Sequence, residues 1–332
     1  MSTKTKEPIE YPSADGRTIV RATIWYPEDE EHPRGIVQLV HGMSEYIDRY
    51  DEFALFLAGN GFIVCGNDHV GHGRSVADFT PTPDQKASFA NPSSSSEWGH
   101  IDVSAGHEVL VRDVISLMEM MREAYPDVPY FLFGHSMGSF IVRCVIARCG
   151  EGLSGAVICG TGNTPAALSK GGNTLARLTA RVRGERHISS LLHSLADGAY
   201  SKAIKNPRTE FDWLNTDDDE VDAYIADPAC GFPFTAGGYA ALTGLTGEAG
   251  DARKATNIPD RLPLLYIAGE GDPVGENGKG VKEAAEIVRA AGAKDVLVKI
   301  YPDMRHEILS EPNHMAIYDD ILYWIEAKLG LI

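Results

Sequence analysis

Short apolar runs along the chain predict strands that are buried on both faces, as in a parallel sheet. One further segment, residues 18–26, alternates imperfectly between apolar and polar positions and follows a turn. We therefore expect an antiparallel strand there, at the edge of the sheet. The buried-strand runs occupy residues 35–40, 62–66, 130–133, 155–160, 262–268 and 296–301.

Helical patterns lie between these strands. The clearest one runs from Leu110 to Tyr125, where apolar residues recur at helical spacing until Pro126 ends the pattern. Shorter apolar faces of the same kind occur at residues 50–57, 140–146, 281–288 and 318–329. Strands that alternate with helices in this way imply a doubly wound, mostly parallel sheet, which is an α/β fold.

The alternation stops between residues 161 and 259. This stretch holds short helical patches, glycine pairs and an acidic run at residues 217–220, but no buried-strand pattern. The strand pattern resumes at Leu262, so the stretch is an insertion into the sheet domain and not a linker. We predict a core formed by residues 1–160 and 260–332, with residues 161–259 as a helical insertion.

The segment from Pro129 to Gly138, PYFLFGHSMG, predicts a strand, a sharp turn and a helix in direct succession. A serine at such a turn is held clear of the sheet, and glycines two residues to either side let strand and helix approach closely. A GxSxG string alone is a weak signal, but it occurs once in this chain and in the expected context. The segment therefore predicts a nucleophile elbow with Ser136 as the nucleophile.

A serine hydroxyl needs a base to remove its proton and a third group to orient that base. In folds with such an elbow, the acid and then the histidine follow the serine, on loops after later strands. Asp272 and His306 occupy those positions and are the candidate acid and base. Glu270 and His314 are the alternatives, although His314 stands where the last helix begins and suits a structural role.

The reaction also needs two donors for the oxyanion that develops on the substrate. One candidate is the backbone N–H of Met137, the residue after the nucleophile, at a helix N-terminus. The second is the N–H of Met43, which follows a His-Gly pair in the loop after residues 35–40. An ordinary tight turn is the alternative explanation of that His-Gly pair.

The net charge of −17, from 30 Lys and Arg against 47 Asp and Glu, would repel a phosphate backbone. No basic stripe with interleaved aromatic residues occurs, so we expect no nucleic-acid partner. His69 and His72 have the spacing of a metal pair but lack a nearby Cys or carboxylate cluster. The pair Gly160 and Gly162 lacks the third glycine of a dinucleotide loop. We therefore expect neither a metal nor another cofactor.

The N-terminus lacks the apolar segment of a secretory signal, and no uninterrupted apolar run approaches the length of about 18 residues that a membrane helix needs. The five cysteines form no CxxC pair, and most of them lie in apolar runs. We expect a soluble, cytoplasmic protein whose thiols are reduced and buried.

Several loops together resemble the α/β-hydrolase superfamily, and within it the monoacylglycerol lipase and lysophospholipase group, often classed with serine aminopeptidase-like hydrolases. The resemblance implies an α/β-hydrolase fold with a mostly parallel eight-stranded sheet and a helical cap inserted after the sixth strand. Tyr46 stands where the group usually has His. The matching segments are HGMSEYIDRY at residues 41–50, NDHVGHGRS at 67–75, GHSMG at the elbow, GDPVG at the acid and RHE at the histidine.

The resemblance implies a serine hydrolase that cleaves carboxylic esters through an acyl-enzyme, and a small-molecule or monoacyl lipid ester as its substrate. A small-ester carboxylesterase and an aminopeptidase are the alternatives among hydrolases. An aminopeptidase would need acids, such as Glu45 or residues 217–220, to hold the substrate's amino group. A binding scaffold without activity is disfavoured, because all three members of the candidate triad are present.

Residues 170–208 of the insertion combine basic and apolar residues. They hold eight Lys or Arg against two acids, and Leu175, Leu178 and Val182 fall on one helical stripe. Two interpretations remain open. Either the leucines pack the insertion onto the core while the arginines face water, or the segment is a lid that shields an acyl chain and rests on an anionic lipid surface.

Overall fold

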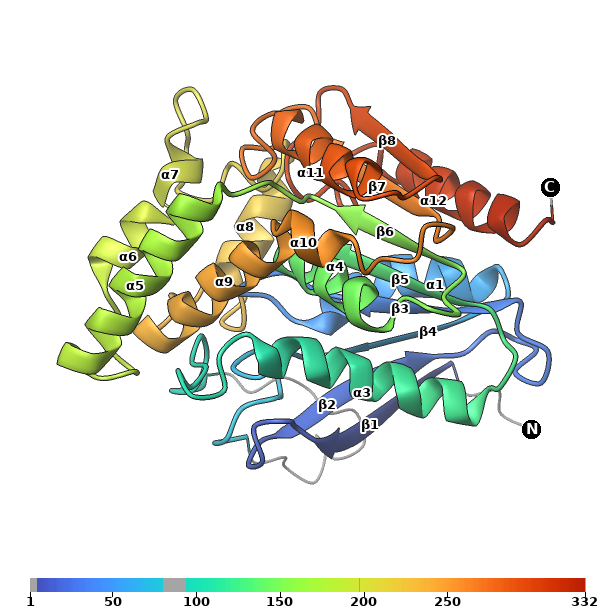
Figure 1. The fold of residues 1–332 in the computed structure, drawn as a ribbon, viewed down its shortest axis with the longest axis horizontal. Coiled ribbons are helices and arrows are strands. Elements are labelled where there is room, and N and C mark those ends of the chain that lie inside the picture. The colour runs from blue at the N-terminus through green and yellow to red at the C-terminus, as the bar shows by residue number, and fades with distance from the viewer. Residues whose placement is uncertain (1–4, 80–93, 197, 332) are drawn as a thin grey trace.

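The computed structural model describes residues 5–79, 94–196 and 198–331. Its centre is an eight-stranded sheet with the strand order β1-β2-β4-β3-β5-β6-β7-β8 (Figure 1). The strands are β1 (Lys6–Pro12), β2 (Ile19–Trp25), β3 (Gly35–Val40), β4 (Phe62–Asn67), β5 (Tyr130–His135), β6 (Gly155–Cys159), β7 (Leu264–Gly269) and β8 (Val296–Tyr301). The strands from β3 to β8 are parallel, whereas β1 and β2 are antiparallel to their neighbours. The mostly parallel, eight-stranded sheet is therefore confirmed.

The outer strand at the N-terminal side of the sheet is β1, which the sequence pattern did not indicate. It pairs along β2 from Lys6 opposite Trp25 to Pro12 opposite Ile19, and β2 pairs with β4 on its other side. The expectation that residues 18–26 form the edge strand is therefore wrong. Prolines and mixed polarity conceal β1 from pattern analysis, and proline is tolerated there because an edge strand has one unpaired side.

Helices cover both faces of the sheet, and successive residues of each strand point alternately to the two helical layers. In β3, Ile36 and Val40 join the core beneath α3, α4 and α11. Val37 and Leu39 join the core beneath α1 and α12. Burial on both faces explains the continuous apolar runs. The helices of the core include α1 (Asp51–Gly59), α3 (Glu108–Ala124), α4 (Met137–Cys149), α11 (Lys279–Ala290) and α12 (His314–Lys328), and the 3-10 helix η1 (Ile47–Tyr50) precedes α1.

Between β6 and β7 the described residues form helices and connecting segments, which extend beyond one end of the sheet (Figure 1). We call residues 161–259 the cap, with the boundaries proposed from the sequence. Its longest helices, α5 and α9, pack side by side through small residues such as Ala176, Ala180 and Ala241, which are buried. The helices are α5 (Ala166–Arg183), α6 (Ser190–Leu195), α7 (Gly198–Ser201), α8 (Asp218–Ala226), α9 (Ala236–Ala249) and α10 (Ala252–Ala255).

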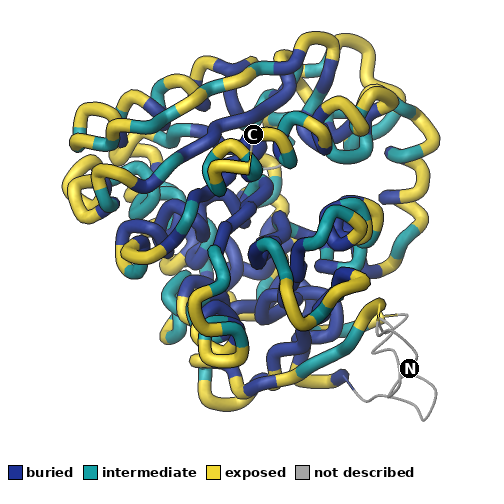
Figure 2. Tube along the Cα trace, turned by 90° about the vertical axis from the view of Figure 1, so that its right-hand side faces the viewer, coloured by how far each residue is buried: buried dark blue, intermediate teal, exposed yellow. Residues whose placement is uncertain are grey.

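Buried residues follow the strands and the inner helix faces, and exposed residues lie mostly on outer turns and outer helix faces (Figure 2). All five cysteines are free thiols, and four are buried as the sequence predicted, whereas Cys149 is only half-buried. Within the ranges that the structure describes, no helix is both long enough and apolar enough to cross a membrane.

Candidate active site

Ser136 lies at the turn between β5 and α4, as a nucleophile elbow requires. Its backbone has φ 52° and ψ −120°, a strained conformation for a residue with a side chain. A Cβ atom at Gly138 would collide with the carbonyl oxygen of Val40, and one at Gly134 would collide with the carbonyl of Gly138. The two glycines therefore allow β3, β5 and α4 to meet closely beneath the serine.

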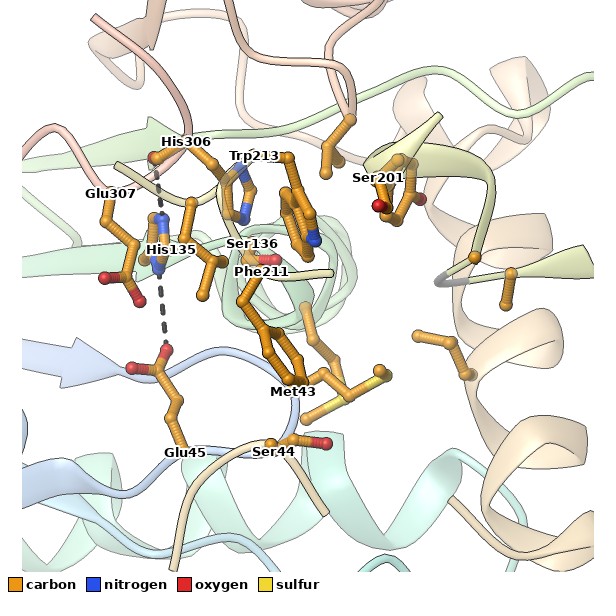
Figure 3. A pocket seen from close by; sticks show the side chains of 18 of the residues that line it. Met43, Ser44, Glu45, His135, Ser136, Ser201, Phe211, Trp213, His306 and Glu307 are labelled. Atoms are coloured by element: carbon orange, nitrogen blue, oxygen red, sulfur yellow. Dashed lines mark hydrogen bonds and ion pairs between the residues drawn. The ribbon is translucent and has the colours of Figure 1, made fainter. Parts of the chain in front are cut away.

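His306 and Asp272 are hydrogen-bonded to each other. Asp272 follows β7 and His306 follows β8, and these adjacent parallel strands end at the same edge of the sheet. Nδ1 of His306 lies 3.0 Å from Oδ1 of Asp272, and both residues are almost fully buried. Because Nδ1 faces the carboxylate, Nε2 is the nitrogen left for a nucleophile. Ser136 and His306 line the same cavity (Figure 3).

The two residues expected to supply the oxyanion donors flank Ser136. Met137 is the first residue of α4, so its backbone N–H has no acceptor within the helix. The loop after β3 comes so close that a Cβ atom at Gly42 would lie 3.1 Å from Cβ of Ser136. Met43 follows in that loop, and both methionines line the cavity.

A buried polar network lies behind the elbow, and the sequence did not indicate it. The carboxylate of Glu45 accepts hydrogen bonds from the backbone N–H of Gly42 and from the Tyr50 hydroxyl. The same hydroxyl lies 2.9 Å from Nδ1 of His135. Nε2 of His135 lies 3.2 Å from the backbone carbonyl oxygen of His306. The network therefore joins the loop after β3, the elbow strand and the loop that carries His306.

Opposite charges compensate for the burial of this network. Burial opposes the charge of Glu45, but hydrogen bonding with His135 and the Arg49 guanidinium hold the pKa of Glu45 well below its ordinary value. Burial also opposes a charged His135, yet Glu45 raises the pKa of His135 above its ordinary value. Arg49 bridges Glu45 at 2.9 Å and Glu307 at 2.7 Å. The only signal in the sequence was that Glu45, Arg49 and Tyr50 share the segment HGMSEYIDRY.

Ser136 faces a cavity of about 140 Å³ between the core and the cap (Figure 3). The ring of Trp213, from the cap, lies 5.0 Å from the ring of His306, measured between ring centres. At Glu45, His135 and Glu307 the cavity adjoins a polar chamber of about 250 Å³. The cavity is therefore polar on that side and mostly apolar elsewhere, although His193, Ser201 and Glu210 also line it. Its apolar lining includes Met43, Met137, Phe140, Phe211, Trp213, Leu214, Phe232 and Leu242.

The alternative acid and base are placed elsewhere. Glu270 is exposed and does not line the cavity. His314 is the first residue of α12, where its Nδ1 lies 2.8 Å from the carbonyl oxygen of Glu311 and its Nε2 lies 3.2 Å from Glu52. The structure therefore brings Asp272, and not Glu270, to a histidine beside Ser136.

His69 and His72 are buried beside His41, with ring centres 4.1 and 5.4 Å from that of His41. Burial lowers the pKa of all three imidazoles and so opposes their protonation. The backbone N–H of His69 donates to Nε2 of His41 at 3.0 Å, which links the loop after β4 to the start of the loop after β3. In the described part of the chain, no group of three or more His, Cys, Asp or Glu side chains is arranged to hold a metal ion.

An elbow serine on a mostly parallel, eight-stranded sheet defines the class of this protein, an α/β-hydrolase. The family model for serine aminopeptidase, S33, matches residues 31–313. The chain belongs to that family. The resemblance to the monoacylglycerol lipase group is also confirmed by the relatives described next.

A monoacylglycerol lipase of Mycolicibacterium smegmatis is 28% identical over 309 residues, which cover 92% of each chain. A monoglyceride lipase of Mus musculus is 27% identical over 321 residues, which cover 96% of this chain and 90% of the other. The crystal structure of a highly thermostable carboxyl esterase from Bacillus coagulans, in complex with glycerol, has a TM-score of 0.86 and 30% identity, covering 98% of this chain and 100% of that one. All three similarities extend over almost the whole chain.

Proposed function

We propose that this protein is a serine hydrolase that cleaves carboxylic esters through an acyl-enzyme intermediate. The observation that carries the proposal is the strained Ser136 facing the same cavity as His306, whose Nδ1 is hydrogen-bonded to Asp272. The names of the relatives, monoacylglycerol lipase and carboxyl esterase, support the same reaction.

In this mechanism, Oγ of Ser136 attacks the ester carbonyl carbon while Nε2 of His306 takes the hydroxyl proton. Asp272 orients the imidazole and stabilises its positive charge. The oxyanion accepts hydrogen bonds from the backbone N–H groups of Met43 and Met137. His306 then gives its proton to the leaving alcohol as the C–O bond breaks. A water molecule hydrolyses the acyl-enzyme by the same steps.

The shape of the cavity supports a monoacyl lipid ester as substrate. Apolar side chains from the core and the cap, such as Phe140, Phe211 and Leu242, can cover an acyl chain. On the other side, Glu45 and Glu307 border the polar chamber and can accept hydrogen bonds from hydroxyl groups. A monoacylglycerol has both parts, and a lysophospholipid shares the single acyl chain.

The outer face of the cap supports contact with an anionic lipid surface. Leu178 and Val182 are 56% and 70% exposed and do not line the cavity, so they neither pack the cap onto the core nor shield an acyl chain. Exposed apolar area beside exposed arginines, here Arg177 and Arg181, favours such surfaces. Of the predicted stripe, only Leu175 packs against a buried hydrophobic cluster, which includes residues of both the cap and the core.

The test is an activity panel with the wild type and Ser136→Ala. The panel contains p-nitrophenyl esters with acyl chains from acetyl to palmitoyl, a monoacylglycerol and a lysophospholipid. We expect ester turnover to fall about 10⁴-fold or more in Ser136→Ala, with unchanged thermal unfolding. A fluorophosphonate should label the wild type only, and labelling that persists in Ser136→Ala would refute the assignment.

A second candidate, hydrolysis of aminoacyl amides, is favoured by the chamber beside the cavity. Glu220, from the acidic run expected to hold an amino group, lines this chamber together with Glu45, Glu52 and Glu307. Glu45 and Glu307 are both already bound by Arg49, so Glu220 and Glu52 are the better partners for an ammonium group. Faster turnover of aminoacyl amides than of esters would establish this function in place of the first.

A further inference from the structure

One cap segment contacts the loop of the candidate base along most of its length. We call residues 209–217 the strap and residues 302–313 the base loop. The ring of Trp213, in the strap, packs on the ring of His306, in the base loop. The strap also carries Phe211 and leads directly into α8. It therefore lines the cavity and touches the base at the same time.

Hydrogen bonds on both sides of His306 hold the base loop to the strap. After the histidine, the backbone N–H of Glu307 donates to the carbonyl oxygen of Leu214 at 2.7 Å. Before it, the guanidinium of Arg305 donates to the carbonyl oxygen of Asn215 at 2.8 Å. The residues next to His306 are thus fixed to the cap by bonds to main-chain atoms of the strap.

A buried carboxylate completes this contact. Glu311 is 1% exposed and does not line the cavity. Its oxygens accept the backbone N–H of Arg305 at 2.7 Å, the backbone N–H of Thr216 at 3.2 Å and the Thr216 hydroxyl. One acceptor therefore binds the residue before His306 and the strap together. Separating the strap from the base loop would remove hydrogen bonds from the buried Glu311 carboxylate, which is costly.

We propose that Glu311 is a positioning residue that couples the strap to His306, so that the cap sets the geometry of the catalytic base as well as lining the cavity. The proposal rests on the proposed function only in taking His306 as the base. Glu311 contacts no reacting atom and acts through the main chain of Arg305. Small displacements of a base cost large factors in rate, because proton transfer requires close alignment.

The test compares Glu311→Ala, which removes the shared acceptor, with Glu311→Gln, which keeps an acceptor oxygen and the side-chain shape. The substrate is p-nitrophenyl acetate, whose acyl group is too short to use the apolar wall. We expect kcat to fall about 10- to 100-fold in Glu311→Ala with little change in KM. Glu311→Gln should recover most of the wild-type kcat.

A matched control separates positioning from stability. Asp113 is fully buried and accepts the Ala14 backbone N–H at 2.7 Å and the Ser13 hydroxyl at 2.8 Å, far from the base loop in the chain and outside the cavity lining. Asp113→Ala should lower Tm about as much as Glu311→Ala while leaving kcat unchanged. All rates are measured at temperatures below the unfolding transitions of both variants. Equal kcat in the two variants, or a loss confined to KM, overturns the proposal.

Two further measurements keep the result unambiguous. The rate of Ser136 labelling by a fluorophosphonate should fall in Glu311→Ala in parallel with kcat, because labelling needs the base but no ester substrate. If the wild type is labelled but hydrolyses no ester, the proposed substrate class is wrong, and the labelling rates still decide the role of Glu311.

If Glu311→Ala does not fold, Thr216→Val, at an exposed position, should lower the labelling rate about threefold through loss of one donor. An unchanged rate there overturns the proposal.

Discussion

The core and the cap form one cavity but hold their side chains in different ways. On the core side, Asp272 and His306 follow adjacent strands and are almost fully buried, each with a hydrogen-bond partner. On the cap side, the helices are mostly short, and their outer faces expose large apolar residues such as Leu178 and Leu191. In the proposed function, the reacting groups are therefore held at the sheet, and substrate selection would fall to the cap, whose outer surface is a more accessible layer.

The cap is nevertheless firmly attached where it meets the core. The buried guanidinium of Arg143, in α4, donates to the carbonyl oxygens of Gly162 at 2.9 Å and Ala249 at 2.8 Å, near the two ends of the cap. Tyr46, the departure from the group's usual His, donates its hydroxyl to the cap residue Asp227 at 2.7 Å. The accessible layer is therefore the outer surface of the cap and not its junction with the core.

The largest expected effect comes from a substitution that changes only the core side of the cavity. Asp272→Asn keeps the side-chain shape but favours the wrong imidazole tautomer of His306, so we expect kcat to fall about 10⁴-fold on acetyl and palmitoyl esters alike. Steady-state kinetics with both p-nitrophenyl esters measure this. Asp113→Asn, at a buried acid outside the cavity lining, should keep wild-type kcat. A loss limited to the palmitoyl ester would show that Asp272 acts on substrate binding instead.

The core was predictable from the sequence because its signals are local. Strands buried on both faces give continuous apolar runs, and the elbow is contained in the ten residues from Pro129 to Gly138. The strand β1 was missed because its prolines and polar residues break the pattern that pairing with β2 would otherwise produce.

The polar network behind the elbow and the exposure of the outer face of the cap were not predictable from the sequence in the same way. Tyr50 and His135 meet across 85 positions of the chain, and no pattern in either segment indicates the other. The stripe that includes Leu178 and Val182 identified one helix face, but a stripe does not reveal whether another element covers it. Only the packing of α5 against α9 shows that this face is left exposed.

The second expected effect is on the cap side alone. In the double variant Leu178→Ser and Val182→Ser, the lost apolar area should weaken binding to anionic vesicles and lower kcat/KM for a vesicle-borne monoacylglycerol about tenfold. Turnover of p-nitrophenyl acetate should stay at the wild-type rate. Leu297→Ser, at a 51% exposed leucine of β8, is the matched control and should bind vesicles as the wild type does. Equal losses on both substrates would contradict the surface role.

The smallest expected effect concerns the seam between cap and core, where Glu248 of α9 meets His107 and Arg148. Nε2 of His107 lies 2.8 Å from the Glu248 carboxylate, and Arg148 donates to it at 2.7 Å. The hydrogen bond with His107 lowers the pKa of Glu248 to about 2, with Arg148 acting in the same direction and burial against it. In the unfolded chain the ordinary pKa is near 4.5.

Between these two values the unfolded state binds more protons than the folded state, so stability rises with pH across the window. The stabilisation is fully present above about pH 5 and is lost as pH falls toward the folded pKa of about 2. Glu248→Gln should therefore lower Tm by about 2 to 4 °C at neutral pH, and the difference from the wild type should shrink at about pH 3.5.

The control is Glu286→Gln, which removes an exposed carboxylate paired with Arg289 on α11. It should change Tm little at either pH, because exposed ion pairs contribute little to stability. A Tm difference for Glu248→Gln that is the same at both pH values would show that the charge of its carboxylate does not stabilise the seam.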